Sequence, residues 1–320
     1  MTQNIKNESI SSSNEAVLIL KNEKLVAIKT ETVYGVACDP SSVLAIKKVY
    51  ELKNRPEFNP LIIHVDSIKL VEKIAEISED SRLIMDNFWP GPLTLILPRK
   101  KSKLVHDFAV SGLKTIAIRL PASQFIKEII KKFKKPIAAP SANESGYISA
   151  TDAQHVYDSF GKKIDLIINS GRTDYGLEST ILDMTVKPYE IKRPGVIDLK
   201  SISKILGKKI INFDLKNNKL SKPNSPGQMI KHYSPNTPIK INSTEINSDD
   251  AFLNFGNKII NFHKPSLNLS EKSNLNEAAF NLFHYLRVLD KYKKKRIVVA
   301  PIPNTGIGKT INERLMRASF

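Results

Sequence analysis

Short apolar runs alternate with amphipathic segments along the first two hundred residues. Apolar or β-branched runs bounded by polar residues, Gly or Pro predict strands, and apolar residues at helical spacing predict helices. The predicted strands are Leu25–Ile28, Leu61–Val65, Leu93–Leu97, Thr115–Leu120, Ile137–Ala139, Leu166–Asn169, Ser179–Asp183 and Tyr189–Arg193. The predicted helices are Val43–Leu52, Ser67–Ile77, Ser81–Phe88, Gln124–Phe133, Ala153–Phe160 and Asp198–Leu206. This order predicts a mixed α/β or α+β layered domain without internal repeats.

The pattern changes after residue 207. Residues 208–236 are rich in Lys, Asn, Pro and Ser and have little apolar periodicity, which is typical of a linker. Beyond them, periodicity returns and predicts a second, smaller α/β domain over residues 237–320. Its predicted elements are a strand marked by Ile259, Ile260 and Phe262, a long helix over Leu275–Tyr292 and a strand over Arg296–Ala300.

Composition agrees with two domains in an ordinary globular protein. The chain has 320 residues, of which 41% are hydrophobic and 25% charged, and one domain takes about 150 residues. The single cysteine, Cys38, excludes a disulfide framework and fits a reducing compartment. No apolar stretch approaches the roughly 20 residues of a membrane span, and the N-terminus lacks the apolar core of a signal peptide. We therefore expect a cytoplasmic protein.

The formal net charge is +17. Clustered basic residues would favour nucleic-acid binding, but lysine far outnumbers arginine and is spread along the whole chain. This spread favours a generally basic, solvated surface over a dedicated RNA site, and it leaves weak, non-specific RNA contact open.

Polar side chains gather at the ends of the first two predicted strands. Thr30, Glu31 and Thr32 follow the first strand, and His64 lies at the end of the second. Ligands of open α/β sheets bind outside the carboxyl ends of strands, so these residues are candidates for a binding site. Lys53 and Arg55 precede the second strand. They either serve that site or complement a helix C-terminus.

Arg119 stands in the otherwise apolar run TIAIRLP, four residues after Thr115 on the same face of the strand. An unpaired buried charge is prohibitive, so Arg119 needs a partner. That partner is either an internal carboxylate or the carboxylate of a ligand, which the guanidinium binds in bidentate fashion.

Five segments, in this order, resemble the threonylcarbamoyl-AMP synthase family of YrdC-like proteins. KTETVYGV is similar to the family's PTETVYGLG, with Lys29 in place of proline, and KNRPEFNPL matches the pattern KxRxxxxPL. PSANESG, GLESTILD and IKRPGVI resemble its SxN, ESTI and RPG segments. SPGQMIKHYSP and GIGKTINERLMRAS are similar to the linker and closing motifs of the long form. The resemblance implies a YrdC-like twisted open sheet with helices (α/β, α+β), a linker folding over the active site, and a smaller Rossmann-like domain.

The resemblance also implies a reaction, in which L-threonine, bicarbonate or CO₂, and ATP give threonylcarbamoyl-AMP and pyrophosphate. Mg²⁺ would accompany ATP, and a downstream transferase complex would use the product to modify adenosine 37 of tRNA. Nucleotidyl transfer depends on positioning and charge stabilisation, which Lys53 and Arg55 would supply, rather than on a covalent nucleophile. The implied threonine-binding residues are Thr32, His64, Arg119, Ala139 and Ser179. The implied ATP-binding residues are Arg55, Asn59, Thr115, Ser141, Asn143, Ser149, Arg193 and Tyr233.

Two other functions remain as alternatives. One is an RNA-binding module of the same fold. The other is a P-loop-like nucleotidase, because PNTGIGKT follows a predicted strand and reproduces the last three P-loop positions at Gly308, Lys309 and Thr310. Pro303 stands where the first P-loop glycine is required, and proline has neither an amide donor nor access to positive φ.

Overall fold

The largest sheet of the first domain carries most of the predicted strands. The computed structural model describes residues 4–212, 232–257 and 265–320. Within them this sheet has seven strands in the order β11-β10-β9-β5-β6-β4-β7. Their bounds are β4 (Ile62–His64), β5 (Leu93–Pro98), β6 (Thr115–Arg119), β7 (Ile137–Ala138), β9 (Thr180–Asp183), β10 (Tyr189–Arg193) and β11 (Ile210–Ile211). Strands β4 and β6 run parallel, so their carboxyl ends meet at one edge.

A second sheet of the first domain has the order β1-β8-β2-β3. Its strands are β1 (Ile5–Asn7), β2 (Val26–Lys29), β3 (Tyr34–Ala37) and β8 (Leu166–Asn169). Isolated bridges pair Gly35 with Ser141 and Cys38 with Ala138, which joins β3 to the end of β7. The two sheets therefore meet at the segment that contains PSAN.

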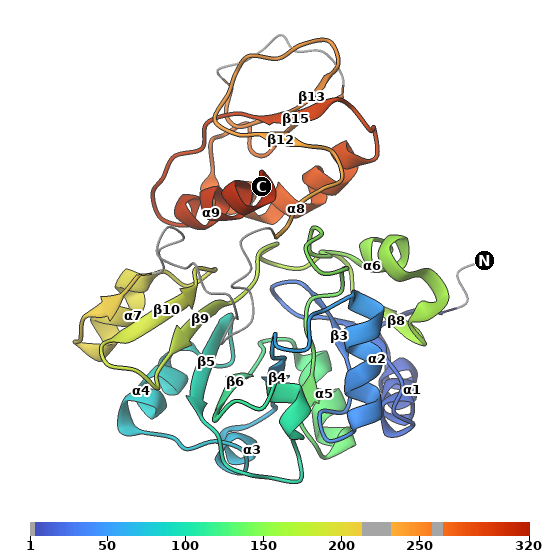
Figure 1. The fold of residues 1–320 in the computed structure, drawn as a ribbon, viewed down its shortest axis with the longest axis vertical. Coiled ribbons are helices and arrows are strands. Elements are labelled where there is room, and N and C mark those ends of the chain that lie inside the picture. The colour runs from blue at the N-terminus through green and yellow to red at the C-terminus, as the bar shows by residue number, and fades with distance from the viewer. Residues whose placement is uncertain (1–3, 213–231, 258–264) are drawn as a thin grey trace.

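Helices cover the outer faces of these sheets (Figure 1). Helix α5 shows why they form where they do: Ser123 caps it, and Phe125, Ile126 and Ile129 bury one face against α1 and the second sheet. The helices of the first domain are α1 (Ile10–Lys21), α2 (Val43–Lys53), α3 (Ile68–Glu72), α4 (Glu79–Phe88), α5 (Gln124–Phe133), α6 (Ala153–Phe160) and α7 (Leu199–Leu206), with 3₁₀ turns at Asp107–Val110 and Gly161–Lys163.

Among its described residues, the second domain has a parallel sheet in the order β12-β15-β13-β14 and two helices. Its elements are β12 (Ile239–Lys240), β13 (Asp250–Asn254), β14 (Ser266–Asn268), β15 (Arg296–Val299), α8 (Leu275–Asp290) and α9 (Gly308–Ala318). Figure 1 shows α8 and α9 between this sheet and the first domain. The mixed α/β fold class with a parallel second domain is confirmed.

Helix α8 joins the two domains through buried polar contacts. The Arg287 guanidinium donates to the carbonyls of Ile148 (2.5 Å), Ser149 (3.3 Å) and His155 (3.3 Å). Asp290 accepts from the Tyr147 hydroxyl at 2.8 Å. Because buried carbonyls need donors, these contacts fix the second domain above the segment that follows PSAN.

Most predicted elements agree with the structure within two residues; the exception is the helix predicted over Ser67–Ile77, which ends at Glu72. The helix α1 was not predicted, and neither were the strands β1 and β3 in the first domain or β12, β13 and β14 in the second. Strand β11 lies inside the segment predicted to be a linker, and it pairs with β10 of the first domain. Residues 213–231 of that segment, and the strand predicted at Ile259–Phe262, lie outside the described residues.

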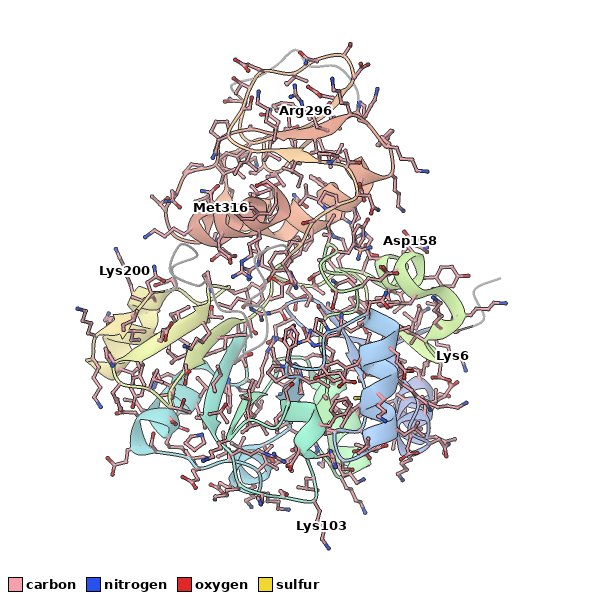
Figure 2. The ribbon with its side chains drawn as sticks, viewed as in Figure 1. Lys6, Lys103, Asp158, Lys200, Arg296 and Met316 are labelled. Carbon is pink, nitrogen blue, oxygen red and sulfur yellow. The ribbon has the colours of Figure 1, made fainter. Side chains whose placement is uncertain are left out.

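Figure 2 shows Lys6, Lys103 and Lys200 pointing outward from separate parts of the first domain, and all three are exposed. This distribution agrees with a dispersed basic surface. No helix in the part of the chain that the structure describes is both long and apolar enough to cross a membrane.

Candidate active site

A cavity of about 50 Å³ lies where the two sheets of the first domain meet. Eight of the predicted site residues line it: Thr32, Arg55, His64, Arg119, Ala139, Ser141, Ser179 and Arg193. Thr30, a candidate from its place after the first strand, also lines the cavity. The remaining lining residues were not predicted to bind a substrate: Val33, Tyr34, Gly35, Ile62, Pro140, Glu178 and His232. The predicted residues Lys53, Asn59, Thr115, Asn143, Ser149 and Tyr233 are not among the lining residues.

A tight turn after β2 holds Thr32 at the cavity. The Thr30 hydroxyl donates to the Val33 carbonyl at 2.6 Å and accepts from the amides of Thr32 and Val33 at 3.2 Å. It also lies 2.8 Å from the Thr32 hydroxyl. Threonine side chains that bond to their own local backbone favour such turns. Thr30 therefore positions Thr32.

Arg119 is held by three partners at the end of β6. Its guanidinium pairs with Glu31 at 2.6 Å, donates to the Thr32 hydroxyl at 2.7 Å, and donates from Nε to the Gly91 carbonyl at 3.1 Å. Burial alone would raise the pKa of Glu31, but the Arg119 charge and hydrogen bond hold it below its ordinary value. Of the two partners considered for Arg119, the internal carboxylate is present and belongs to Glu31. Arg119 still faces the cavity, where N–H groups of its fork not used by these contacts can meet a ligand.

His64 lies opposite Arg119 in the β4–β6 register. It is buried, and its Nδ1 atom has no hydrogen-bond partner within the described residues. Burial, together with the Arg119 charge, lowers the pKa of His64 to about 3. The imidazole is therefore neutral at physiological pH and offers the cavity a polar contact rather than a charge.

Two further guanidinium groups reach the cavity. Arg193, at the end of β10, donates from Nε and one terminal nitrogen to the Ser179 carbonyl at 3.1 and 3.0 Å, and to the Ser179 hydroxyl at 3.1 Å. Burial lowers the pKa of Arg193 below its ordinary value. Arg55 donates to the carbonyl of Asn59 (2.9 Å), its side-chain oxygen (2.7 Å) and the Pro60 carbonyl (2.7 Å). Asn59 therefore acts on the cavity through Arg55.

Gly195, in the RPG segment, is required by close backbone packing. A Cβ atom at this position would lie 2.2 Å from the Thr180 amide nitrogen and 2.4 Å from the Ser179 carbonyl carbon. Any side chain here would push the segment away from Ser179 and Arg193.

The contacts of Lys53 differ from the prediction that its charge acts directly on phosphates. It lies in the last turn of α2, and its Nζ donates to the Ser141 carbonyl at 2.5 Å and to the Asn143 carbonyl. Burial, and then the charge of Arg55, lower the pKa of Lys53 well below its ordinary value. The lysine ties α2 to PSAN and so positions Ser141 at the cavity.

The end of the segment predicted to be a linker supplies His232 to the cavity, whereas the predicted Tyr233 is not among the lining residues. Tyr233 has a φ of +64° and is fully buried. Its ring stacks on Phe283 of α8, with 5.4 Å between ring centroids, while the preceding His232 lines the cavity. A positive φ is uncommon for tyrosine. Here it occurs where His232 lines the cavity of the first domain and Tyr233 packs against the second domain.

Three other predicted residues lie outside the cavity for identifiable reasons. Ser149 donates to Glu178 at 2.5 Å, and the Asn143 amide donates to the carbonyls of Glu144 (2.7 Å) and Tyr147 (2.9 Å). Thr115 begins β6, at the end opposite Arg119. The first two shape the loop around the cavity, whereas Thr115 is remote from the lining residues.

The P-loop-like segment is engaged in packing. The Thr310 hydroxyl donates to the Gly195 carbonyl at 3.0 Å, and the amide of Gly308 donates to the Thr305 carbonyl at 2.8 Å. Lys309 is exposed. A phosphate-binding loop needs free amides that converge on one point, so this geometry argues against the nucleotidase alternative.

Comparison with known proteins shows the family of this chain. A family model described as "Telomere recombination" matches residues 18–195, and a model described as "Threonylcarbamoyl-AMP synthase, C-terminal domain" matches residues 197–319. The chain belongs to the threonylcarbamoyl-AMP synthase family. The family member of Pyrococcus abyssi is 36% identical, over 94% of this chain and 92% of its own length. The Bacillus subtilis member is 34% identical, over 95% and 92%.

A solved structure of a family member has the same fold. The crystal structure of P. abyssi Sua5 complexed with L-threonine superimposes with a TM-score of 0.90 at 31% identity, covering 98% of this chain and 96% of that protein. Both domains of this chain are therefore those of the family.

Proposed function

We propose that this chain is an L-threonylcarbamoyladenylate synthase, which converts L-threonine, bicarbonate or CO₂, and ATP to threonylcarbamoyl-AMP and pyrophosphate. The observation that carries the proposal is the cavity itself. It combines hydroxyl groups and a neutral imidazole with three guanidinium groups, of which those of Arg119 and Arg193 are buried and that of Arg55 is half-buried. Neutral polar groups suit a small amino acid, and guanidinium groups suit carboxylate and phosphate.

The threonine subsite comprises Thr32, His64, Arg119, Ala139 and Ser179. Arg119 binds the substrate carboxylate with N–H groups that remain beside its bonds to Glu31 and Thr32. The neutral His64 and the Ser179 hydroxyl contact the polar atoms of the substrate, and Ala139 limits the space for its side chain. The 2.8 Å contact between the hydroxyls of Thr94 and Ser179 fixes Ser179 for this role.

The ATP subsite comprises Arg55, Ser141 and Arg193, supported by Asn59, Asn143, Ser149 and Tyr233 outside the cavity wall. Thr115 has the weakest support, because it lies at the opposite end of β6 from Arg119. Mg²⁺ enters with ATP as a phosphate complex. The lining carboxylate Glu178 already accepts hydrogen bonds from Ser149 and Arg314, so we assign no protein ligand to the ion.

The chemistry requires two bond-forming steps. The threonine amine adds to CO₂ and loses a proton, which gives a carbamate; when bicarbonate is the source, water is released. A carbamate oxygen then attacks the α-phosphorus of ATP, and the bond to the pyrophosphate oxygen breaks. Arg55 and Arg193 stabilise the charge that develops on the phosphates, and the cavity excludes water from the carbamate.

The product is an activated carbamoyl group, so a transferase must consume it. We propose a cytoplasmic tRNA-modifying complex that acts on adenosine 37. Non-specific RNA contact through the dispersed lysines would be weak and would fall steeply with salt.

The test is pyrophosphate release from ATP, with L-threonine and bicarbonate each omitted in turn. We expect release to require both substrates. Release that continues without threonine would contradict the proposal.

A variant pair locates the threonine subsite. Arg119→Lys keeps the charge beside Glu31 but loses the planar fork, so we expect KM for threonine to rise by at least about tenfold. Arg82→Lys is the control. Arg82 lies on α4 with about half of its side chain exposed to solvent, so this variant should leave KM for threonine unchanged. Equal KM values for Arg119→Lys and the unaltered protein would remove Arg119 from the subsite.

A further inference from the structure

Two histidines and an aspartate meet at the interface of the two domains, away from the cavity. Asp152 is the N-cap of α6, His155 lies in the first turn of that helix, and His284 comes from α8 of the second domain. The Asp152 Oδ2 atom lies 3.3 Å from His155 Nε2 and 3.3 Å from His284 Nδ1. These three atoms all lie within 4.8 Å of one another.

We propose that Asp152, His155 and His284 bind a divalent transition-metal ion, with Zn²⁺ as the best fit, and that this ion links α6 to α8 across the domain interface. Two imidazoles and one carboxylate form a ligand set typical of Zn²⁺. Ligands about 2.0–2.2 Å from a tetrahedral ion lie about 3.3–3.5 Å from each other. Both oxygen-to-nitrogen distances match this separation.

Hydrogen bonding alone accounts less well for the cluster. A separation of 3.3 Å exceeds the usual length of a charge-assisted hydrogen bond, which is about 2.7–2.9 Å. His284 Nδ1 is buried and has no hydrogen-bond partner within the described residues. Nδ1 therefore lies 3.3 Å from the Asp152 carboxylate without a hydrogen bond, and a cation shared by the two groups would satisfy both.

The groups around the cluster orient its ligands. Asp152 Oδ1 accepts from the His155 amide at 2.8 Å, which caps α6 and leaves Oδ2 for the ion. The Thr151 amide donates to His155 Nδ1 at 3.3 Å, and the Thr151 hydroxyl lies 3.3 Å from the same atom. Metal binding at Nε2 therefore requires the ring proton to move to Nδ1, where the Thr151 hydroxyl can accept it.

The site is open on one side. The His284 side chain is 27% exposed and that of Asp152 is 18% exposed, which leaves room for a water as the fourth ligand. The Arg287 guanidinium bonds to the His155 carbonyl at 3.3 Å and adds a positive charge nearby. We therefore expect weaker binding than at a structural site with four protein ligands. Mg²⁺ prefers oxygen ligands and should not bind.

The experiment is a ZnCl₂ titration of the full chain after chelator treatment, followed by calorimetry and thermal unfolding. We expect one saturable equivalent of Zn²⁺ and a rise in Tm that MgCl₂ does not produce. His284→Gln removes one ligand and should weaken Zn²⁺ binding by at least tenfold and abolish the rise in Tm. His106→Gln changes an exposed histidine elsewhere and is the matched control.

Three results would overturn the proposal. They are the absence of saturable binding, equal binding by His284→Gln and the unaltered protein, and loss of binding in His106→Gln. A Co²⁺ titration of the unaltered protein keeps the test decisive even if a variant is unstable. Visible ligand-field bands that Zn²⁺ abolishes are expected from this site, and a featureless spectrum would count against it.

Discussion

Arg314 of α9 donates from Nε to Glu178 Oε2 at 3.0 Å, across 136 residues of sequence and across the domain boundary. Glu178 lines the cavity, and both side chains are buried. Burial alone would raise the pKa of Glu178, but the charges of Arg314 and Arg193 hold it below its ordinary value. The second domain thus helps to keep one wall of the cavity negatively charged.

Replacing Arg314 should therefore impair both folding and catalysis. Arg314→Met leaves the buried Glu178 carboxylate without its nearest cation, which should lower the free energy of unfolding by about 3–5 kcal/mol. Pyrophosphate release should fall at least tenfold. Adding Glu178→Gln should restore part of the stability, because the uncompensated charge is removed. Strictly additive effects in this double-mutant cycle, measured by urea unfolding, would show that the two side chains are not coupled.

Lys53 should matter for stability as well as for ATP binding. Lys53→Met removes the donor to the buried carbonyls of Ser141 and Asn143, so we expect a loss of about 2–4 kcal/mol in the free energy of unfolding. KM for ATP should rise because Ser141 loses its support. Lys47→Met, at an exposed position on the same helix, should change the free energy of unfolding by less than about 0.5 kcal/mol. Equal stabilities of the two variants would contradict this role.

His64 should contribute to acid destabilisation. Its pKa is lowered to about 3 in the folded chain from an ordinary value of 6.5. The unfolded state therefore binds a proton that the folded state does not, and stability falls as pH drops from 6.5 towards 3. The unaltered protein loses stability between pH 6.5 and pH 5 in part through His64, and His64→Gln should reduce that loss in the free energy of unfolding by roughly 1.6 kcal/mol. Urea unfolding at several pH values measures this, and parallel profiles for variant and unaltered protein would contradict it.

Lys309 distinguishes the synthase from the P-loop nucleotidase. Lys309→Met should leave ATP turnover unchanged, because the lysine is exposed and the neighbouring Thr310 packs on Gly195. Arg193→Met, at the cavity, should reduce pyrophosphate release strongly in the same assay. The opposite ranking would favour the nucleotidase alternative.

The sequence was sufficient to predict which strand ends form the site, because local periodicity and chain order determine where strands stop. It could not assign the partner of Arg119. Glu31 is distant in sequence, and only the packing of the TETV turn against β6 brings the two side chains together. Lys53 was ambiguous for the same reason, since its acceptors are backbone carbonyls that carry no signal in the sequence.

Two other differences have local causes. Helix α1 was not predicted because its first turn is rich in serine, yet Ser9 and Ser12 form a reciprocal capping box that starts the helix. The resemblance to the family assigned Tyr233 to the nucleotide, and the positive φ with which its ring enters the core cannot be read from the sequence. The two neighbouring side chains point in different directions: His232 lines the cavity and Tyr233 is buried in the core.

The pairing of β1 with β8 has a consequence for the order of folding. Asn4, beside β1, bonds to the Ile164 carbonyl, 160 residues farther along the chain. At about 5–20 residues per second, the ribosome needs roughly 8–32 s to synthesise that interval. Until β8 emerges, β2 can pair only with β3. The apolar edge of β2 that β8 covers in the folded protein is exposed during this time. Unpaired edges recruit other chains, so the nascent chain is most prone to aggregation during this interval, long before the cavity closes.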